Sequence, residues 1–256
     1  MEFKDKVVLI TGAAGGIGAA TAREFAKEGA KLALVDLSMD ALEDLAKTLN
    51  TDDYLLVTAD VRDEEQVKNY VDKTVERFGR IDVFINNAGI NGGFHPITEQ
   101  PTENLKNVIE VNLYGAYWGL KYVLQVMKKQ KSGSVVNMAS VGGLIGSPGM
   151  SAYIASKHAL IGINKCAAIE VVDYGIRVNA VCPSGVDTDM MKRIETNAFG
   201  KSDEETREAF AAGVPMKRYA TPEEVAHVML FLASDKASFL TGQYVRIDGG
   251  GGITSV

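Results

Sequence analysis

Short runs of apolar, largely β-branched residues alternate with longer segments of mixed polarity along most of the chain. Such runs occur at residues 6–11, 31–36, 54–60, 81–87, 132–140, 176–183 and 242–248. Near-continuous apolar runs of this length are typical of strands buried on both faces of a parallel sheet. The pattern predicts a doubly wound α/β fold with about seven strands and with helices on both faces.

The segments between these runs carry the start and stop signals of helices. Ser38 and Asp40 can each cap a helix, and Asp63 opens a segment that closes at Gly79. Thr221 precedes a proline and a capping-box glutamate, which together mark a helix start. Helices are therefore predicted over residues 19–29, 38–49, 63–79, 111–131 and 152–172, and from residue 221 onward.

Two segments interrupt the alternation. Residues 91–101 form a polar loop after the fourth run, and residues 186–219 form a long insertion before the seventh, in which Ser202 can begin a further helix. Such sheets bind ligands at loops that follow the carboxyl ends of parallel strands, so both segments are candidate substrate walls. No second domain or internal repeat is evident. We expect one domain over residues 1–256, with a substrate lid at about 186–219.

Composition narrows the functional classes. The chain has 256 residues, of which 46% are hydrophobic and 23% charged, enough for a substantial core. Its formal charge of −6 argues against a nucleic-acid partner, and the lysines at 128–131 are interpreted as a solvated helix end. Cys166 and Cys182 lack CxxC spacing, so no metal is expected. Neither a signal peptide nor a spanning helix is recognised at the start, so we expect a cytoplasmic location and no membrane partner.

A glycine-rich turn joins the first apolar run to the helix that follows it. Its spacing is G-x-x-x-G-x-G, within TGAAGGIG at residues 11–18. Glycines there permit positive φ and allow backbone amides and the helix N-terminus to approach a pyrophosphate. Glycine turns also serve packing alone, but the strand and helix flanks favour dinucleotide binding by a Rossmann-type sheet. The candidate cofactor contacts are Gly12, Gly15, Gly16, Ile17 and Gly18.

Asp36 ends the second run and bears on the choice of cofactor. A carboxylate at this place can accept hydrogen bonds from both hydroxyls of an adenosine ribose, and it would repel a 2′-phosphate. Neither Gly15 nor Leu37, the nearest candidate contacts, is basic. NAD is therefore favoured over NADP, although Asp36 can alternatively cap the next helix.

Tyr153 and Lys157 lie four residues apart in a predicted helix, with Ser140 upstream. An i,i+4 pair shares one helix face, so the ammonium group can act on the phenol. Lowering the pKa of a tyrosine from ~10 by ~3 units requires roughly 4 kcal/mol, which one cation at ~4 Å supplies in a partly desolvated site. The same spacing also occurs by chance on solvated helix faces. A catalytic interpretation therefore requires that the pair lie in a cleft.

Taken together, these motifs resemble the short-chain dehydrogenase/reductase family, in the family's order and over nearly the whole chain. The resemblance rests on TGAAGGIG, Asp60 in TADV, NNAG at 86–89, Asn112 in VNLYGA, Ser140, Tyr153-x-x-x-Lys157, RVNAVCP and the terminal IDGG. It implies an oxidoreductase that transfers a hydride between NAD(H) and a secondary alcohol or ketone.

The resemblance also implies catalytic roles. Tyr153 would exchange a proton with the substrate oxygen, and Lys157 would bind the nicotinamide ribose and lower the tyrosine pKa. Ser140 would hold the substrate oxygen by a hydrogen bond, and Asn112 would hold a water in a proton relay. The active phenol is therefore expected to depend on bound NAD.

Further cofactor contacts follow from the same resemblance. Asp60 and Val61 would lie at adenine, although Asp60 can instead be a strand-end cap. The family usually carries P-G-x-x-x-T after the sixth strand, whereas this chain has Pro183-Ser184-Gly185-Val186-Asp187-Thr188. The serine puts the local backbone in doubt. The implied contacts along the far side and at the carboxamide are Asn87, Ala88, Gly89, Pro183, Val186 and Thr188.

Candidate substrate contacts come from three segments around the expected site. Most are apolar and flexible, which suits a small cyclic or moderately hydrophobic substrate, and ordinary loop packing explains each of them equally well. His95 is the sharpest candidate. Besides Ser140 and Tyr153, the set comprises Asn91, Phe94, His95, Gly142, Leu144, Ser147, Met150, Met190, Met191, Ile194 and Phe199.

Several alternatives remain open within and beyond the family. Segments such as VGGLIGSPG resemble ring-ketone and levodione-type reductases, but similar ones recur among sugar and polyol dehydrogenases. A 3-oxoacyl-carrier-protein reductase would commonly use NADPH and a basic docking surface, and neither is visible. A non-catalytic nucleotide-binding scaffold would usually lack the tyrosine or the lysine.

The predicted helix over residues 152–172 is apolar around most of its circumference, more than one face of a sheet should bury. Together with the resemblance, this implies a homotetramer built partly from helices 102–130 and 152–172.

Overall fold

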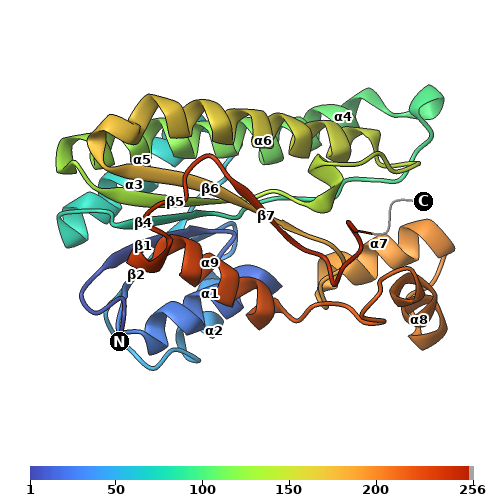
Figure 1. Cartoon of the computed structure of the whole chain (residues 1–256), viewed down its shortest axis with the longest axis horizontal. Coiled ribbons are helices and arrows are strands. Elements are labelled where there is room, and N and C mark those ends of the chain that lie inside the picture. Colours follow the sequence, from blue (N-terminus) through green and yellow to red (C-terminus); the bar gives the residue numbers. More distant parts are fainter. Residues whose placement is uncertain (254–256) are drawn as a thin grey trace.

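A single parallel sheet of seven strands organises the chain, in the order β3-β2-β1-β4-β5-β6-β7 (Figure 1). The computed structural model describes residues 1–253, so the last part of the predicted domain, 254–256, lies outside the described residues. The α/β fold predicted from the apolar runs is confirmed. The strands are β1 (Val7–Thr11), β2 (Lys31–Asp36), β3 (Tyr54–Thr58), β4 (Val83–Asn86), β5 (Gly133–Met138), β6 (Ile176–Pro183) and β7 (Tyr244–Ile247).

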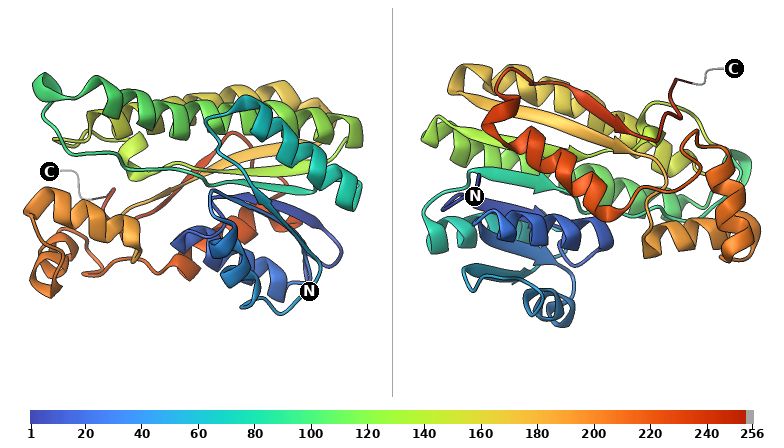
Figure 2. Two further views of the ribbon diagram at one scale, coloured as in Figure 1. Left: turned by 180° about the vertical axis from the view of Figure 1, so that it is seen from behind. Right: turned by 60° about the horizontal axis from the view of Figure 1, so that its bottom comes forward.

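Helices cover both faces of this sheet (Figures 1 and 2). One face carries α1 (Gly16–Lys27), α2 (Met39–Ala46) and α9 (Pro222–Ala233), and the other carries α3 (Glu64–Phe78), α4 (Thr102–Ile109), α5 (Ala116–Gln130) and α6 (Ser151–Val171). The protein has one hydrophobic core on each face of the sheet, and successive residues of a strand pack into opposite cores. In β1, Val8 and Ile10 pack toward α1 and α9, and Leu9 packs toward α3 and α5. This two-sided burial explains why the strands are apolar at consecutive positions.

Local signals fix several helix ends as predicted. The Asp63 side chain accepts hydrogen bonds from the backbone amides of Glu65 and Gln66, and α3 ends at Gly79 in a left-handed conformation, φ 78°. Thr221 and Glu224 form the expected capping box at the start of α9. Other ends differ by a few residues, since α1 begins at Gly16 directly behind the glycine turn and α2 ends at Ala46.

The predicted helix 111–131 is the larger part of a longer, interrupted one. A π-helical turn, Glu110–Gly115, lies between α4 and α5. Such turns insert an extra residue into a helix and occur often at functional sites. Here the turn contains Asn112, whose side chain is fully buried.

The insertion between β6 and β7 forms a helical lobe beyond the carboxyl ends of the strands. It contains α7 (Asp189–Phe199) and α8 (Glu204–Ala212), at the right of Figure 1. The predicted cap before α8 is made by Asp203, which accepts a hydrogen bond from the Thr206 amide. The lobe faces the tip of β1, so the chain encloses the edge where ligands are expected.

Candidate active site

One cleft runs along the carboxyl edge of the sheet, with a volume of about 910 Å³. Its floor begins at the turn between β1 and α1, where Gly12 has φ +62°. A Cβ added at Gly18 would lie 2.1 Å from the Gly12 carbonyl oxygen, and one added at Gly16 would lie 2.7 Å from Thr188 Cγ2. Glycine is therefore required for this close backbone approach, which leaves room for a bulky anion above the N-terminus of α1.

Asn87 and Thr11 hold the glycine turn against the end of β4. The Asn87 side-chain amide donates hydrogen bonds to the carbonyls of Thr11 (2.9 Å) and Gly12 (3.0 Å). The Thr11 hydroxyl in turn accepts hydrogen bonds from the backbone amides of Asn87 and Ala88. The predicted contacts of β1 and β4 thus meet along one wall, and Gly89, like Ala88, lines the cleft.

Asp36 lies at the tip of β2 and faces the same cleft. Its carboxylate accepts hydrogen bonds from the backbone amides of Ala14 (2.9 Å) and Leu37 (2.8 Å). These bonds fix the orientation of the carboxylate at the glycine turn. The alternative role as a helix cap is not what the structure shows, because Ser38 caps α2 through the Ala41 amide.

Asp60 and Val61 also line this end of the cleft, after β3. The guanidinium of Arg62 donates hydrogen bonds to both carboxylate oxygens of Asp60, and these bonds lower the pKa of Asp60. Arg62 also reaches the Asn107 side chain at 3.1 Å. The only arginine beside Asp36 and Asp60 in the described part of the cleft is therefore already neutralised.

Ser140, Tyr153 and Lys157 meet at the other end of the cleft. Ser140 follows β5, and its hydroxyl accepts a hydrogen bond from the Gly142 amide at 3.0 Å. The Ser140 hydroxyl and the Tyr153 ring both approach the position of Gly142. Lys157, one turn after Tyr153 on α6, is only 3% exposed. Its ammonium group donates to the Met138 carbonyl at 2.8 Å and lies 5.6 Å from the centre of the tyrosine ring.

Burial dominates the electrostatics of this group. It raises the pKa of Tyr153, an effect that the hydrogen bond with Ser140 opposes, and it lowers the pKa of Lys157 to about 8. No carboxylate among residues 1–253 forms an ion pair with Lys157, which explains the direction of its shift. Tyr153 is therefore a protonated phenol in the chain alone, next to a lysine whose pKa lies below its ordinary value but above neutral pH.

Asn112 stands directly behind this group rather than in the cleft. Its side-chain oxygen accepts from the Ile90 amide at 2.8 Å, and its amide donates to the Ile90 carbonyl (2.8 Å) and to Ser156 (3.1 Å). A Cβ added at Gly89 would approach both Asn112 Oδ1, at 3.2 Å, and Lys157 Nζ, at 3.4 Å. The π-helical turn thus connects the wall from β4 to the lysine on α6.

Comparisons with known proteins show the family of this chain. The family model described as enoyl-(acyl carrier protein) reductase matches residues 12–251. A levodione reductase from Leifsonia aquatica is 44% identical over 97% of this chain and 95% of its own. The chain belongs to the short-chain dehydrogenase/reductase family. Nicotinamide cofactors are typical of this family, and the glycine cradle and cleft described above fit one.

Other relatives of this short-chain dehydrogenase/reductase have names that state different substrates or cofactors. A 3-oxoacyl-[acyl-carrier-protein] reductase of Thermotoga maritima is 42% identical over 98% of this chain and 99% of its own. A crystal structure of levodione reductase has a TM-score of 0.96 at 43% identity, covering 99% of this chain and 100% of that one. NAD+-bound xylitol dehydrogenase scores 0.92 at 36% identity, covering 98% and 100%, respectively. ElxO with NADP bound scores 0.89 at 35%, covering 97% and 99%.

The substrate end of the cleft contains many of the predicted contacts. Gly142, Ser147, Met150, Met190, Met191 and Ile194 line it, whereas Asn91, Phe94, His95, Leu144 and Phe199 do not. The His95 amide donates to the Gly149 carbonyl at 2.9 Å, and the imidazole lies over Gly93. His95 therefore ties two loops together beside the cleft.

Several lining residues were not identified from the sequence. Those around the substrate end include Ile90, Val141, Ile145, Ile154, Phe210 and Val214, together with Arg193 and Tyr219. Most lie on the lobe or on helix faces without a motif, so only the proximity of α7, α8 and α6 brings them together. Among the described residues, no cluster of three His, Cys, Asp or Glu side chains can hold a metal ion, and no helix is long and apolar enough to cross a membrane.

Proposed function

We propose that this oxidoreductase transfers a hydride between NAD(H) and a secondary alcohol or ketone with a small cyclic or moderately hydrophobic body. The observation that carries the proposal is the meeting of Ser140, Tyr153 and Lys157 in a cleft continuous with the glycine turn. When bound, the dinucleotide would supply the hydride donor or acceptor. Its contacts would be those predicted above, from Gly12 and Asp36 at one end to Val186 and Thr188 at the other.

Asp36 supports NAD over NADP. Its carboxylate is fixed by two backbone amides and bears a negative charge where a 2′-phosphate would lie. Arg62, which lines this end of the cleft, is paired with Asp60. A phosphate at this place would therefore meet a carboxylate without a free cation to offset it.

The chain's own residues would divide the proton chemistry. Tyr153 would give its phenolic proton to a carbonyl oxygen, or take one from an alcohol, and Ser140 would hold that oxygen by a hydrogen bond. Lys157 would bind ribose hydroxyls and stabilise the phenolate by its charge. Asn112 would order the backbone next to Lys157 and hold a relay water. Ile145, Met150 and Met190 would exclude bulk water.

A carrier-protein reductase is the second candidate, favoured by the relative from Thermotoga maritima. Acidic carrier proteins need a basic docking surface. On the lobe, Lys192 pairs with Asp189, Lys201 with Asp203 and Glu205, and Arg207 with Asp187. These pairs leave little net positive charge at the entrance, so a free small alcohol or ketone is the better supported substrate.

Steady-state assays with both cofactors test the proposal. We expect turnover with NAD on at least one member of a panel of cyclic alcohols, polyols and hydroxy acids, and at least ~10-fold lower kcat/KM with NADP. Acetoacetyl thioesters of pantetheine and of carrier protein test the second candidate. A clear NADPH preference, or activity confined to the thioesters, would contradict the proposal.

A further inference from the structure

Tyr219 forms part of the cleft wall at the end of the lobe, after the lining residues Phe210 and Val214. Its side chain is 7% exposed. A Cβ added at Gly185 would lie 2.9 and 3.1 Å from carbons of the Tyr219 ring, so the ring packs flat on the backbone that follows β6. That backbone includes the departure from the family pattern, where Ser184 and Gly185 follow Pro183.

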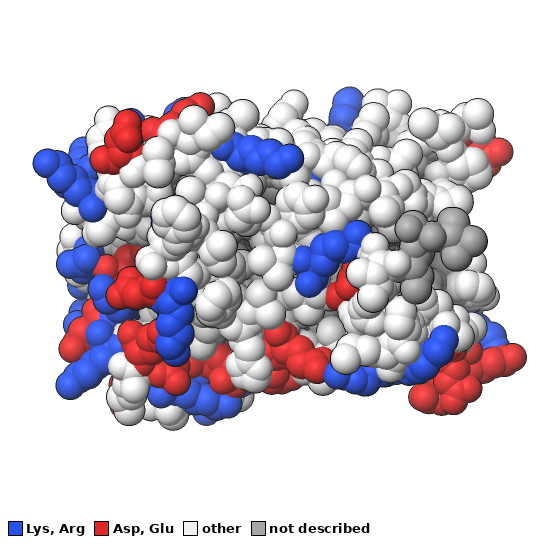
Figure 3. Space-filling view, viewed as in Figure 1, with Lys and Arg blue, Asp and Glu red and all other residues white. Residues whose placement is uncertain are grey.

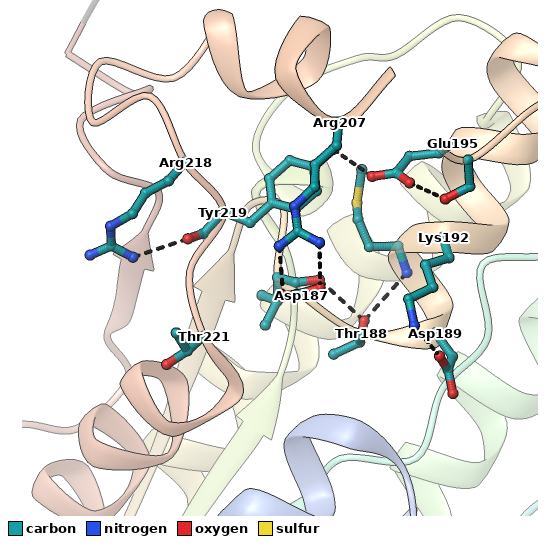
Figure 4. A network of polar contacts seen from close by, with 12 residues as sticks. Asp187, Thr188, Asp189, Lys192, Glu195, Arg207, Arg218, Tyr219 and Thr221 are labelled. Atoms are coloured by element: carbon teal, nitrogen blue, oxygen red, sulfur yellow. Dashed lines mark hydrogen bonds and ion pairs between the residues drawn. The ribbon is translucent and has the colours of Figure 1, made fainter. Parts of the chain in front are cut away.

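A buried carboxylate on α7 holds the hydroxyl of this tyrosine (Figure 4). Glu195 is 2% exposed, and its Oε1 accepts a hydrogen bond from Tyr219 at 2.7 Å. Its other oxygen accepts a short hydrogen bond from Ser202. An acidic group at this depth costs free energy unless its hydrogen bonds are made, so the Tyr219 hydroxyl has a structural reason to stay in place.

An ion pair also packs against the ring. The Arg207 guanidinium lies 5.2 Å from the ring centre, and it donates to both oxygens of Asp187, at 2.9 and 2.6 Å (Figure 4). Asp187 and Gly185 are themselves held by the residue after Tyr219. The Asp187 amide donates to the Ala220 carbonyl, and the Ala220 amide donates to the Gly185 carbonyl, both at 3.0 Å.

This network ends at the part of the cleft opposite Asp36. Between Gly185 and α7 the backbone contains Val186, which pairs with Ala220 in a parallel bridge, and Thr188, which caps α7. Thr188 also contacts the position of Gly16, as described above. The network therefore controls segment 184–188, which lines the nicotinamide end of the proposed cofactor site.

We propose that Tyr219, held by Glu195 and Arg207, is a positioning residue that sets segment 184–188 for the nicotinamide end of the dinucleotide. The inference rests on the proposed function, since it concerns the same cofactor. The proposed effect is confined to the surroundings of Tyr219. Loss of the Tyr219 hydroxyl leaves a buried oxygen of Glu195 without its hydrogen-bond donor, which costs free energy. We expect the lobe to reduce this cost by a shift of segment 184–188, while the Gly12 to Gly18 turn stays in place.

Calorimetric titration of Tyr219→Phe with NADH and with 5′-AMP tests the inference. The phenylalanine keeps the ring on Gly185 and removes only the hydroxyl. We expect the Kd for NADH to rise about 10-fold, whereas the Kd for 5′-AMP, which reaches only the Asp36 end, changes less than about 2-fold. A general loss of structure would weaken both ligands together.

Conservative and control variants sharpen this result. Glu195→Gln keeps an acceptor for Tyr219, so its Kd for NADH should stay within about 3-fold of wild type. Glu195→Ala removes the acceptor and should raise the Kd for NADH as Tyr219→Phe does. Lys201→Gln removes the exposed ion pairs of Lys201 with Asp203 and Glu205 on the same lobe and should change neither Kd.

The outcomes separate the two proposals. Equal weakening of NADH and 5′-AMP, or no weakening of either, would overturn the positioning role while wild-type binding and turnover leave the proposed function standing. A wild-type chain that binds only NADPH would overturn the choice of NAD, and the Tyr219→Phe comparison would then be made with NADPH. A wild-type chain that binds neither dinucleotide would overturn both proposals.

Discussion

Lys157 is the residue at which function and stability conflict most directly. Its ammonium group is buried, is bonded to one carbonyl and has no carboxylate partner among residues 1–253. Burial of a charge without a partner is unfavourable, which is why the pKa falls. The same depth gives its charge a strong effect on any phenolate or ribose nearby. A stabilising replacement at this position would therefore be expected to abolish the proposed chemistry.

The pH dependence of stability measures that conflict. The pKa of Lys157 is about 8 in the folded chain against an ordinary value of 10.5, so the unfolded state binds more protons between these limits. The free energy of unfolding of wild type should gain ~3 kcal/mol from this group as the pH rises through the window. Lys157→Met lacks this gain, so its stability advantage over wild type should be largest near pH 7.

Urea unfolding of both proteins at several pH values checks this prediction. The difference between their free energies of unfolding should shrink steadily toward pH 10.5, because other titrating groups are common to both. A difference that is constant with pH would mean that Lys157 is not shifted in the folded chain.

At the scale of elements, two short irregular segments do most to shape the site. The turn before α1 brings backbone to the cleft floor, and the π-helical turn Glu110–Gly115 brings Asn112 behind Lys157. Regular helices and strands supply the frame, but the approach of Gly18 to Gly12 is too close for any side chain. The glycine turn and Asn112 thus lie where regular structure is interrupted, whereas Tyr153 and Lys157 lie on the regular helix α6.

Gly18→Ala should harm both folding and binding. The added methyl would displace the Gly12 carbonyl, with a loss of about 1–3 kcal/mol in unfolding free energy and at least 10-fold weaker binding of NADH. Gly162→Ala is the matched control, because apart from the adjoining backbone of α6 no atom of residues 1–253 in the same chain lies within 4 Å of its added Cβ, and it should stabilise by up to ~1 kcal/mol. Urea unfolding and calorimetry measure both effects. Equal behaviour of the two variants would contradict the account of the turn.

Local signals in the sequence predict the ends of helices better than they predict which residues of the lobe line the cleft. The ends of α3 and α9 follow from Asp63, Gly79 and Thr221, whose caps depend only on neighbouring residues. The π-helical turn and the cleft contacts of Tyr219 depend on packing between distant segments, so no local pattern reveals them. His95 illustrates the converse, since it lies in the predicted loop but does not line the cleft, and its imidazole lies over Gly93 instead.

At the scale of the whole molecule, large apolar side chains are exposed on two parts of the surface. One lies on α5 and α6 and includes Tyr117 and Ile169, which are 52% and 77% exposed. The other lies by α9 and β7 and includes Phe239 and Tyr244. Figure 3 shows that the centre of the face over β7 carries few charged side chains. Two different self-complementary surfaces suit a tetramer with dihedral symmetry, and we propose such a homotetramer.

Ile169→Glu tests this assembly. Light scattering should give the mass of four chains for wild type and a smaller species for the variant, because the charge would be buried between copies. Circular dichroism should show that the variant remains folded, and Glu170→Gln, on the same exposed stretch of α6, should remain tetrameric. A monomeric wild-type protein would contradict the proposal.

Replacing Tyr153 by phenylalanine tests the proton-transfer centre most directly. Wild type and Tyr153→Phe would be compared with NAD on the best secondary alcohol of the panel, together with their affinities for NADH. We predict that Tyr153→Phe binds NADH within about 3-fold of wild type but loses ~10²- to 10⁴-fold in kcat, the range expected for a general acid–base. Turnover by Tyr153→Phe at the wild-type rate would contradict the central claim.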